Sequence, residues 1–340
     1  MDEAMGYYRR AVEADPGLAR AAYNLGLGLI VRGEYAEGWE LHERRFDTTP
    51  PIAVRRRFAI PPFEPADFST GERVAIWAEQ GVGDQILYST LVPEMVARGA
   101  SVVLEVDPRL LAAFRRAHPE WSLATPQESA AAFAECTREI ALGSLPRLLR
   151  PSRESFAAQP GRLLAADPAR AARYRERLSA QGVKTVAISW RSFQPKARAH
   201  LQRKKSSHLE AFAALARRAD LRLVDLQYGD TAAEREAFAR AGGHLARIDE
   251  LDLFNDLEGV LAAIEACDVV LTTSNVTAHF AGALGKRTLL VYLAANAPFH
   301  YWMAGPGGRS LWYPSVEIVT APELDTWDKV LARAAQVLGQ

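Results

Sequence analysis

The first 46 residues carry the spacing of apolar positions that is typical of packed helices. Apolar residues recur three and four positions apart over residues 4–46, and the pattern is broken at Asp15-Pro16-Gly17 and at Arg32-Gly33-Glu34. This pattern predicts two amphipathic helices and the start of a third. Small and aromatic residues lie where neighbouring helices would cross, and these are Ala11, Pro16, Ala22, Tyr23, Leu25, Gly26, Gly33 and Tyr35.

This segment resembles one tetratricopeptide repeat, a pair of helices with small residues at the crossing. A single repeat cannot bury its own apolar face, because such stacks need about three repeats to be stable. The sequence therefore leaves three alternatives open. The segment is part of a longer array, or it packs on the domain that follows, or it is a pair of ordinary helices without a binding role.

Residues 50–72 are rich in proline and arginine, which is typical of a linker. Arg55, Arg56 and Arg57 are expected to be solvated or to dock this linker.

From residue 73 onward, short apolar runs alternate with helical patterns, which predicts parallel sheets with helical crossovers. Strands are expected at 73–79, 101–106, 185–190, 221–228, 268–273 and 288–293, and helices at 84–98, 109–117 and 326–339. The two sets of strands predict two doubly wound α/β domains that divide near residue 170 and face each other across a cleft. Ligands then bind at the carboxyl ends of the strands. The last helix packs on one domain or the other.

Composition narrows the classes of function. The chain has 340 residues, with 41 basic and 41 acidic side chains, so no net charge attracts nucleic acid or an anionic membrane. Its cysteines, Cys136 and Cys267, lie in apolar stretches, which predicts buried thiols in a reducing compartment. We find no signal-peptide core and no apolar run long enough to span a membrane. A soluble, cytoplasmic protein is expected.

The first candidate site is the turn Gly81-Val82-Gly83-Asp84 after the strand at 73–79. A dinucleotide-binding turn is one interpretation, with Glu105 as the ribose ligand, but Ile86 occupies the position that requires a third glycine. Otherwise Asp84 either caps a helix or faces the cleft as a reactive carboxylate. These last two roles are compatible.

The second candidate site follows the strand at 268–273. Ser274 and Asn275 are good helix caps, and a helix starting near Val276 would offer backbone N–H groups and the positive end of its dipole to an anion such as a diphosphate. His279, in the first turn, is expected either to face the same anion or a sugar hydroxyl, or to be an ordinary hydrogen-bonded residue.

A basic segment supplies the third candidate site. Residues 189–212 follow a strand and precede a helix expected to be capped at Ser206 or Ser207. The segment either neutralises phosphate or is a solvated loop, and its cations are Arg191, Lys196, Arg198, Arg203, Lys204 and Lys205. Gln227 and Tyr228, at the end of another strand, are candidates for base contacts or for a structural role.

Several motifs occur together and in order, and they resemble the bacterial tetratricopeptide-repeat glycosyltransferases, whose catalytic part is similar to ADP-heptose:lipopolysaccharide heptosyltransferases. The motifs are GEYAEGWELHERRF (33–46), WAEQGVGDQI (77–86), GSLP (143–146), ISWRS (188–192), the pair Lys205-Ser206, DLQYG (225–229), SNVTAHFAGALGK (274–286) and WYPS (312–315). The resemblance covers nearly the whole chain. It implies a GT-B fold with two Rossmann-like domains, an acceptor on the first, a nucleotide-sugar on the second, and no metal or other cofactor.

The resemblance also assigns roles to individual residues. It implies that Asp84 is the general base, that Lys205 contacts the donor phosphates, and that Asn275 to His279 form the diphosphate turn. The further binding candidates are Gly83, Trp190, Arg191, Gln227, Tyr228, Ser274, Val276, Thr277 and Ala278, with His279 beside Asp84 as a catalytic candidate. Many relatives have Asp-Thr or Asp-Ser where this chain has Ser274-Asn275, and the loss of that carboxylate favours a different donor or a binding fold without activity.

These observations predict three parts: a repeat-like segment at 1–47, an acceptor domain at 48–170 and a donor domain at 171–340. The expected function is metal-independent, inverting transfer of a sugar to a cell-envelope acceptor or to a protein, such as flagellin or another surface protein, held by the helical segment. A binding or scaffolding module with the same fold is the first alternative, and a dinucleotide-dependent oxidoreductase is the second. The sequence does not identify the nucleotide, sugar, acceptor or oligomeric state.

Overall fold

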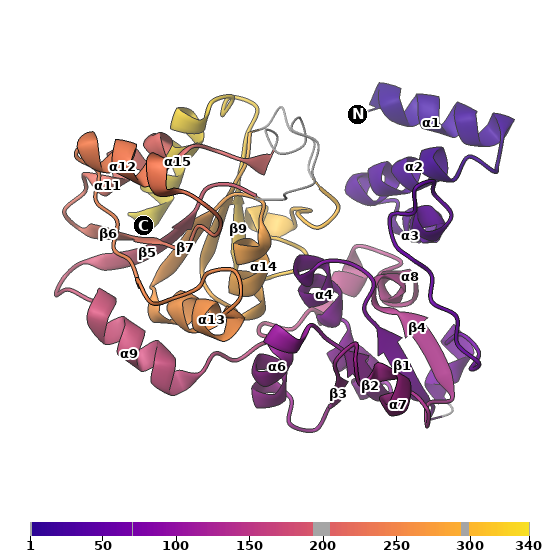
Figure 1. Cartoon of the computed structure of the whole chain (residues 1–340). Coiled ribbons are helices and arrows are strands. Elements are labelled where there is room, and N and C mark those ends of the chain that lie inside the picture. The colour runs from indigo at the N-terminus through magenta and orange to yellow at the C-terminus, as the bar shows by residue number, and fades with distance from the viewer. Residues whose placement is uncertain (1, 70, 193–204, 294–298, 340) are drawn as a thin grey trace. The chain divides into compact units, whose positions relative to one another are not determined.

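The computed structural model describes residues 2–69, 71–192, 205–293 and 299–339. The chain forms two compact units, each with its own parallel sheet (Figure 1). The first unit contains Met1–Leu111, His118–Pro160 and Ala297–Met303, and the second contains Ala112–Ala117, Gly161–Asn296 and Ala304–Gln340. The predicted α/β class with two parallel sheets is therefore confirmed.

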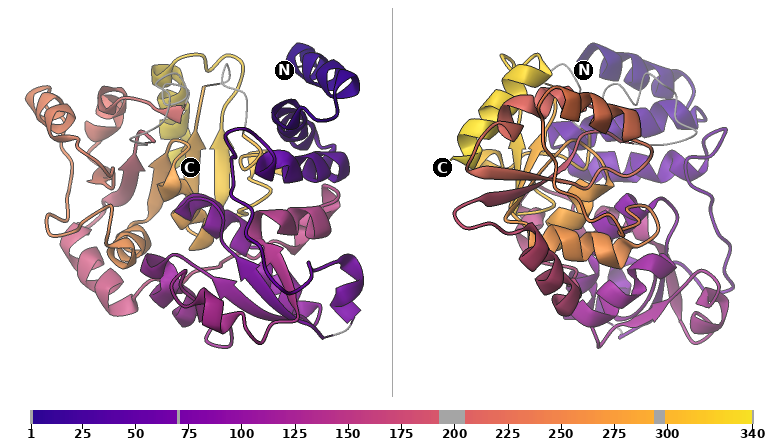
Figure 2. Two further views of the ribbon diagram at one scale, coloured as in Figure 1. Left: turned by 45° about the vertical axis from the view of Figure 1, so that its right-hand side comes forward. Right: turned by 60° about the vertical axis from the view of Figure 1, so that its left-hand side comes forward.

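Three helices open the first unit: α1 (Asp2–Ala14), α2 (Ala19–Arg32) and α3 (Tyr35–His42), followed by the short 3₁₀ helix η1 (Glu43–Phe46). Their breaks lie where the sequence predicts them, and Figure 2 shows the three helices side by side. Glycines allow α2 and α3 to approach closely, since a Cβ on Gly26 would lie 2.9 Å from the Gly38 carbonyl oxygen. We call α1 to η1 the helical segment; its identity as a tetratricopeptide repeat stays a prediction.

The first sheet has the strand order β3-β2-β1-β4, and all its strands are parallel. Its strands are β1 (Arg73–Trp77), β2 (Ser101–Glu105), β3 (Ser122–Ala124) and β4 (Arg138–Ala141). Both faces of β1 are buried: Ala75 and Trp77 pack in one apolar cluster, and Val74 and Ile76 point to the opposite face. The sequence predicts β1 and β2 but not the shorter β3 and β4.

The helices of the first unit depart from the expected pattern in one place. Its main helices are α4 (Val82–Ser89), α5 (Val92–Ala97), α7 (Ser129–Ala132) and α8 (Leu145–Leu149), whereas α6 (Leu111–Ala117) belongs to the second unit except for its first residue. Two helices thus replace the single one expected at 84–98. Pro93 explains the break, because it lacks an N–H group for the Ser89 carbonyl and its ring would clash there. A 3₁₀ turn, Pro108–Leu110, precedes α6.

Residues 50–72 are docked on the first sheet rather than extended as a free linker. The backbone of Phe63 and Pro61 hydrogen-bonds to both sides of Glu139 in β4, at 2.8 and 3.0 Å. Arg56 forms two hydrogen bonds to the carboxylate of Glu105, at 2.8 and 2.7 Å, whereas Arg55 and Arg57 are exposed. The arginine run therefore contains one docking residue between two solvated ones.

The second sheet is also parallel, with the order β6-β5-β7-β8-β9. Its strands are β5 (Lys184–Ser189), β6 (Leu221–Asp225), β7 (Val269–Thr272), β8 (Thr288–Val291) and β9 (Val316–Val319). The sequence predicts the first four but places their carboxyl ends one to three residues too far along. Those extra residues leave the sheet and form the loops at its carboxyl edge.

Helices cover both faces of the second sheet. They are α9 (Pro168–Leu178), α11 (Ala213–Ala216), α12 (Ala232–Arg240), α13 (Leu257–Ala266), α14 (Val276–Ala283) and α15 (Trp327–Leu338). The last helix, α15, packs on β8 and β9, which settles the open question of its domain. The cap expected at Ser206 or Ser207 is wrong, because the 3₁₀ turn Leu209–Phe212 begins after His208 without a side-chain cap.

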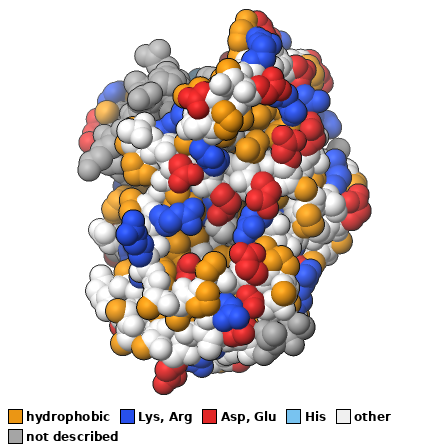
Figure 3. All heavy atoms as spheres, turned by 90° about the vertical axis from the view of Figure 1, so that its right-hand side faces the viewer, with side chains coloured by type: hydrophobic (Ala, Val, Ile, Leu, Met, Phe, Trp, Pro, Cys, Tyr) orange, Lys and Arg blue, Asp and Glu red, His pale blue; other side chains and the backbone are white. Residues whose placement is uncertain are grey.

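Acidic and basic side chains are mixed on the face drawn in Figure 3, without a large region of one sign. Cys136 and Cys267 are buried free thiols, as predicted. Among the described helices, none combines the length and the apolar character that crossing a bilayer requires.

Candidate functional site

The carboxyl edge of the second sheet brings most of the predicted binding residues together. Strand β5 has β6 on one side and β7 on the other, so the chain changes direction between β5 and β7. Such a switch point is where open α/β sheets bind ligands. Three loops meet there, and their predicted residues are Trp190 and Arg191 after β5, Gln227 and Tyr228 after β6, and Ser274 to Ala278 after β7.

Gln227 ties the end of β5 to the end of β6. Its side-chain oxygen accepts hydrogen bonds from the backbone N–H groups of Trp190 and Arg191, both at 2.8 Å, and from the Ser189 hydroxyl at 3.1 Å. Its amide nitrogen donates to the carbonyl oxygens of Arg191 and Tyr228. Both amide atoms are therefore engaged inside the chain, which favours a structural role; a base contact by Gln227 stays a prediction.

Asn275 extends this network across the switch point to β7. It is the N-cap of α14, as predicted, and its side-chain oxygen accepts the Thr277 N–H at 2.9 Å. Its amide nitrogen donates to the Ser189 hydroxyl at 2.9 Å and to the Arg191 carbonyl at 3.4 Å. An aspartate at this position could cap the helix equally well but could not donate these two hydrogen bonds.

The N-terminus of α14 is the predicted anion site, and part of its hydrogen-bonding capacity is already used. Its dipole favours negative charge. Two of its first N–H groups already have acceptors, since Thr277 donates to the Asn275 side chain and Ala278 donates to the Asn275 carbonyl at 3.2 Å. Ser274 and Asn275 are buried and Val276 is half-buried.

His279 is in hydrogen-bond contact with an aromatic residue 34 positions later in the sequence. Its Nδ1 lies 3.0 Å from the Tyr313 hydroxyl, and the imidazole is only 8% exposed. The Tyr313 ring fits against α14 because Gly282 has no Cβ; an added Cβ would lie 2.5 Å from the ring. His279 is therefore a buried, hydrogen-bonded residue, and its catalytic role stays a prediction.

Two cationic candidates, Arg191 and Lys205, lie beside the end of β5. The Arg191 Nε lies 3.2 Å from one oxygen of the Glu234 carboxylate, and the indole of the preceding residue, Trp190, donates to the other oxygen at 2.7 Å. Lys205 is half-buried. Two residues later, the Ser207 N–H donates to the Trp190 carbonyl at 2.7 Å, which connects this segment to the end of β5. The other predicted cations, Lys196, Arg198, Arg203 and Lys204, lie outside the described residues.

In the first unit, Asp84 and Gly83 lie at the corresponding switch point, between β1 and β4. The N-cap of α4 is Gly81 without a side-chain hydrogen bond, so the capping role considered for Asp84 is wrong. Asp84 is half-buried in the first turn. Burial, and then the charge of Asp84, raises the pKa of Tyr23 to about 12 and that of Tyr88 well above its usual range.

The ribose role considered for Glu105 has no support in this geometry. Its carboxylate is buried and takes both hydrogen bonds from Arg56. The dinucleotide interpretation loses its acidic ligand as well as its third glycine.

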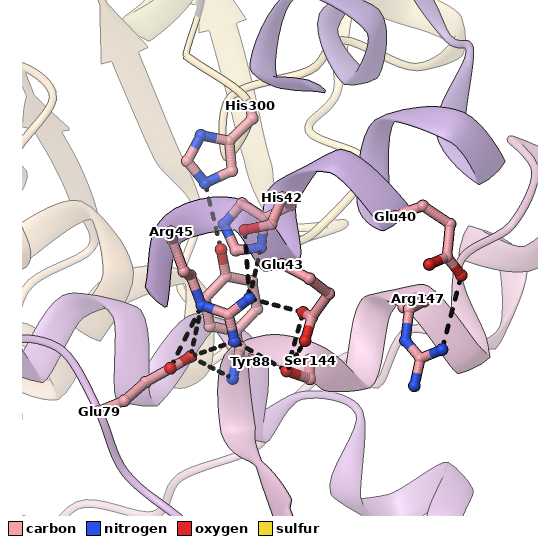
Figure 4. Close-up of polar contacts among 10 residues, drawn as sticks. Glu40, His42, Glu43, Arg45, Glu79, Tyr88, Ser144, Arg147 and His300 are labelled. Atoms are coloured by element: carbon pink, nitrogen blue, oxygen red, sulfur yellow. Dashed lines mark hydrogen bonds and ion pairs between the residues drawn. The ribbon is translucent and has the colours of Figure 1, made fainter. Parts of the chain in front are cut away.

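Sequence reasoning missed a buried charged network beside Asp84, drawn in Figure 4. Arg45, the penultimate residue of η1, is fully buried and donates to the carboxylates of Glu79 and Glu43 and to the Ser144 hydroxyl at 2.8 Å. The motif 33–46 contains the signal that could have identified it, because Glu43 and Arg45 directly follow the buried Trp39 and His42.

Two histidines adjoin the network. Burial, and then the Arg45 charge, holds the pKa of His42 well below its usual range. Its Nδ1 lies 3.3 Å from the Arg45 guanidinium, which can only donate, so the ring proton of neutral His42 belongs on Nε2. His300 Nε2 lies 3.2 Å from the Tyr88 hydroxyl. Among the described residues, we find no group of three or more His, Cys, Asp or Glu side chains that could hold a metal ion.

Comparison with known proteins supports the fold. No protein-family model matches the chain. Protein FlbA of Caulobacter vibrioides is 29% identical over 329 residues, a match that covers 91% of this chain and 53% of that protein. The chain thus spans about half the length of this curated relative.

Two solved structures resemble the chain. A glycosyltransferase family 9 protein from Veillonella parvula has a TM-score of 0.52 at 12% identity, covering 79% of this chain and 97% of that one. The ADP-heptose lipopolysaccharide heptosyltransferase II of E. coli has a TM-score of 0.49 at 14% identity, covering 79% and 99%. The Veillonella protein therefore shares the α/β fold with two parallel sheets.

Proposed function

We propose that this protein is a glycosyltransferase of the GT-B type that uses a nucleotide-sugar as donor. The observation that carries the proposal is the hydrogen-bonded chain from Gln227 through Ser189 to Asn275, which assembles a binding edge at the switch point of the second sheet. That edge combines the α14 dipole with the Arg191 cation and, next to it, Lys205. This is a chemistry suited to a diphosphate.

The proposed reaction is an inverting displacement without metal. Asp84 takes the proton of an acceptor hydroxyl, whose oxygen attacks the anomeric carbon of the donor. The bond from that carbon to the diphosphate oxygen breaks, and the electron pair leaves with the nucleoside diphosphate. The positive end of α14 and the two cations offset the charge that develops on this leaving group.

The proposed acceptor is a protein, with flagellin or another bacterial surface protein as a candidate, or a component of the cell envelope. Contact between a protein acceptor and the helical segment belongs to the proposal. So does a cytoplasmic location.

Replacing Asp84 by asparagine tests the catalytic half of the proposal. Asp84→Asn removes the base but keeps the shape, so we expect the transfer rate to fall by about 10²- to 10⁴-fold. The rate is measured with radiolabelled donor in the folded variant. Asp67→Asn, which changes a carboxylate paired with Arg138 in the same unit, serves as the control and is expected to keep the rate. An unchanged rate in Asp84→Asn would exclude the proposed base.

A thermal-shift panel with UDP, GDP, ADP, dTDP, CDP, CMP and NAD tests the donor site. A ligand at a hundredfold excess over its dissociation constant stabilises the folded state by about 2.7 kcal/mol, so a donor nucleotide raises the melting temperature. We expect one nucleoside diphosphate to do so, with the shift lost in Asn275→Ala and Lys205→Ala. Lys184→Ala is the matched control, because this lysine lies at the other end of β5. A shift with NAD alone would favour an oxidoreductase instead.

A scaffold that binds nucleotide-sugar without turnover is the second candidate. The observation that favours it is that the amide groups of Gln227 and Asn275 are already engaged inside the chain. Nucleotide binding with neither sugar transfer nor donor hydrolysis would support this candidate and exclude the enzyme.

A further inference from the structure

Arg45 is a buried cation shared by two parts of the first unit. Its guanidinium lies 2.8 Å from Glu79, which follows β1, and 2.5 Å from Glu43 in the helical segment itself. The side chains of Arg45 and Glu79 are 0% and 2% exposed. Charges this deeply buried are retained only with close partners and full hydrogen bonding.

Glu79 connects Arg45 to the loop after β4. One Glu79 oxygen accepts the Gly143 backbone N–H at 3.1 Å. Gly143 permits this approach, because a Cβ there would collide with the same carboxylate oxygen and lie 3.4 Å from the Tyr88 ring. Ser144, the next residue, accepts from Arg45 at 2.8 Å and donates to Glu43 at 2.8 Å. Figure 4 shows these groups converging on one guanidinium.

The network also borders the turn that carries Asp84. Glu79 lies two residues before Gly81, the N-cap of α4. On the same helix, Tyr88 is one turn after Asp84; burial and then the charge of Asp84 raise the pKa of Tyr88, and the charge of Arg45 lowers it. Arg45 therefore lies at the point where the helical segment, the β1–α4 turn and the β4–α8 loop meet.

We propose that Arg45 is a positioning residue, which locks the Gly81–Asp84 turn against the Gly143-Ser144 loop and makes the helical segment a part of the catalytic machinery. This inference rests on the proposed function, in which Asp84 is the base. It assigns the helical segment a second role besides contact with an acceptor.

Comparison of Arg45→Gln with a matched buried arginine tests the inference. Arg150→Gln is the control, because the Arg150 side chain is also 0% exposed and pairs with Glu94 at 2.6 Å in the same unit. Arg45→Gln loses its ion pairs to Glu79 and Glu43, and Arg150→Gln loses its pair to Glu94, but only Arg45 contacts the residues beside the Asp84 turn. Arg45→Lys is the conservative variant; it keeps the charge but cannot reach Glu79, Glu43 and Ser144 together.

Three quantities are measured on the full chain, below the melting temperature of each variant: kcat, KM for the donor, and amide hydrogen exchange. We expect Arg45→Gln to lower kcat by about 100-fold and to change KM less than about threefold, because a misplaced catalytic group costs rate rather than donor binding. The kcat of Arg45→Lys should lie between those of Arg45→Gln and the unmodified protein, and Arg150→Gln should keep kcat within about threefold. Exchange in peptides covering 80–90 and 141–147 should rise about tenfold or more in Arg45→Gln alone.

Equal losses of kcat in Arg45→Gln and Arg150→Gln, or unchanged exchange in the two peptides, would overturn the inference. Failure of the proposed function gives a different result, namely no transfer and no donor hydrolysis by the unmodified protein. In that case the exchange comparison alone decides whether Arg45 positions the turn.

Discussion

The two sheets have the same kind of switch point, but different chemistry holds each of them together. At the β1/β4 edge of the first unit, the connecting side chains are ions: Arg45, Glu79 and Glu43. At the β5/β7 edge of the second unit, they are the neutral side chains of Gln227, Ser189 and Asn275. Parallel topology thus determines where a site lies, while the local sequence determines which interactions support it.

The ionic and the neutral network differ because they connect parts of the chain at different separations in the sequence. In the second unit, the amides link loops that leave neighbouring strands, and side-chain amides reach nearby backbone groups without placing charge in a low-dielectric environment. In the first unit, Arg45 reaches Ser144 from a helical segment 99 residues away in the sequence. A long, forked cation can satisfy several acceptors at once. The first network contains titratable carboxylates and the three side chains of the second do not titrate, so we expect the first network to depend more strongly on pH.

The largest expected effect is the loss of the buried cation. Arg45→Met leaves the Glu79 carboxylate buried without its partner, so we expect the free energy of unfolding of the first unit to fall by about 3–5 kcal/mol at pH 8. Burial already raises the pKa of Glu79, and without Arg45 that pKa rises further. The folded variant then binds a proton that the unfolded chain has released, so the loss should be smaller at pH 5.

Urea unfolding followed by tryptophan fluorescence at pH 5 and pH 8 measures this difference. Arg45→Met combined with Glu79→Leu should regain part of the lost stability and should lose most of the pH dependence, because no titratable group remains at residue 79. Equal losses of stability at both pH values would show that the uncompensated charge of Glu79 is not the cause of the loss.

The neutral network should respond next, and with little pH dependence, because its titratable neighbour Asp225 accepts the backbone N–H of residue 227, which the variant keeps. Gln227→Ala leaves the backbone N–H groups of Trp190 and Arg191 without their acceptor, so we expect a loss of about 2–4 kcal/mol at both pH 5 and pH 8. Gln336→Ala, on the exposed side of α15, is the control and should change stability by less than about 0.5 kcal/mol. A loss that varies with pH would contradict the contrast between the two networks.

The smallest effects come from a matched pair of tyrosines. Tyr88→Phe removes a hydrogen bond to His300 in the first unit, and Tyr313→Phe removes one to His279 in the second. Each should cost about 0.5–1.5 kcal/mol in thermal unfolding. If Tyr88→Phe costs clearly more than Tyr313→Phe, the ionic network extends through Tyr88; if neither variant changes stability, these contacts do not contribute.

The sequence predicts the fold better than the site, for a physical reason. Strands β1, β2 and β5 to β8 are apolar runs buried on both faces, and such runs are recognisable from composition alone. Strands β3, β4 and β9 are missed because each has only three or four residues and none contains a run of more than two apolar residues. Their strand conformation depends on the neighbours with which they pair.

Features that depend on a few neighbouring residues can be predicted from the sequence, whereas contacts between distant residues cannot. The sequence by itself determines the helical segment, the alternation of strands and helices, and the cap at Asn275, because periodicity and capping act over a few residues. Only the tertiary structure decides three contacts. Arg56 hydrogen-bonds to Glu105, Gln227 accepts hydrogen bonds from the loop after β5, and Arg45 pairs with Glu79, 34 residues away in the sequence. Partners of buried polar groups are chosen by proximity in the folded chain, and no local pattern encodes that proximity.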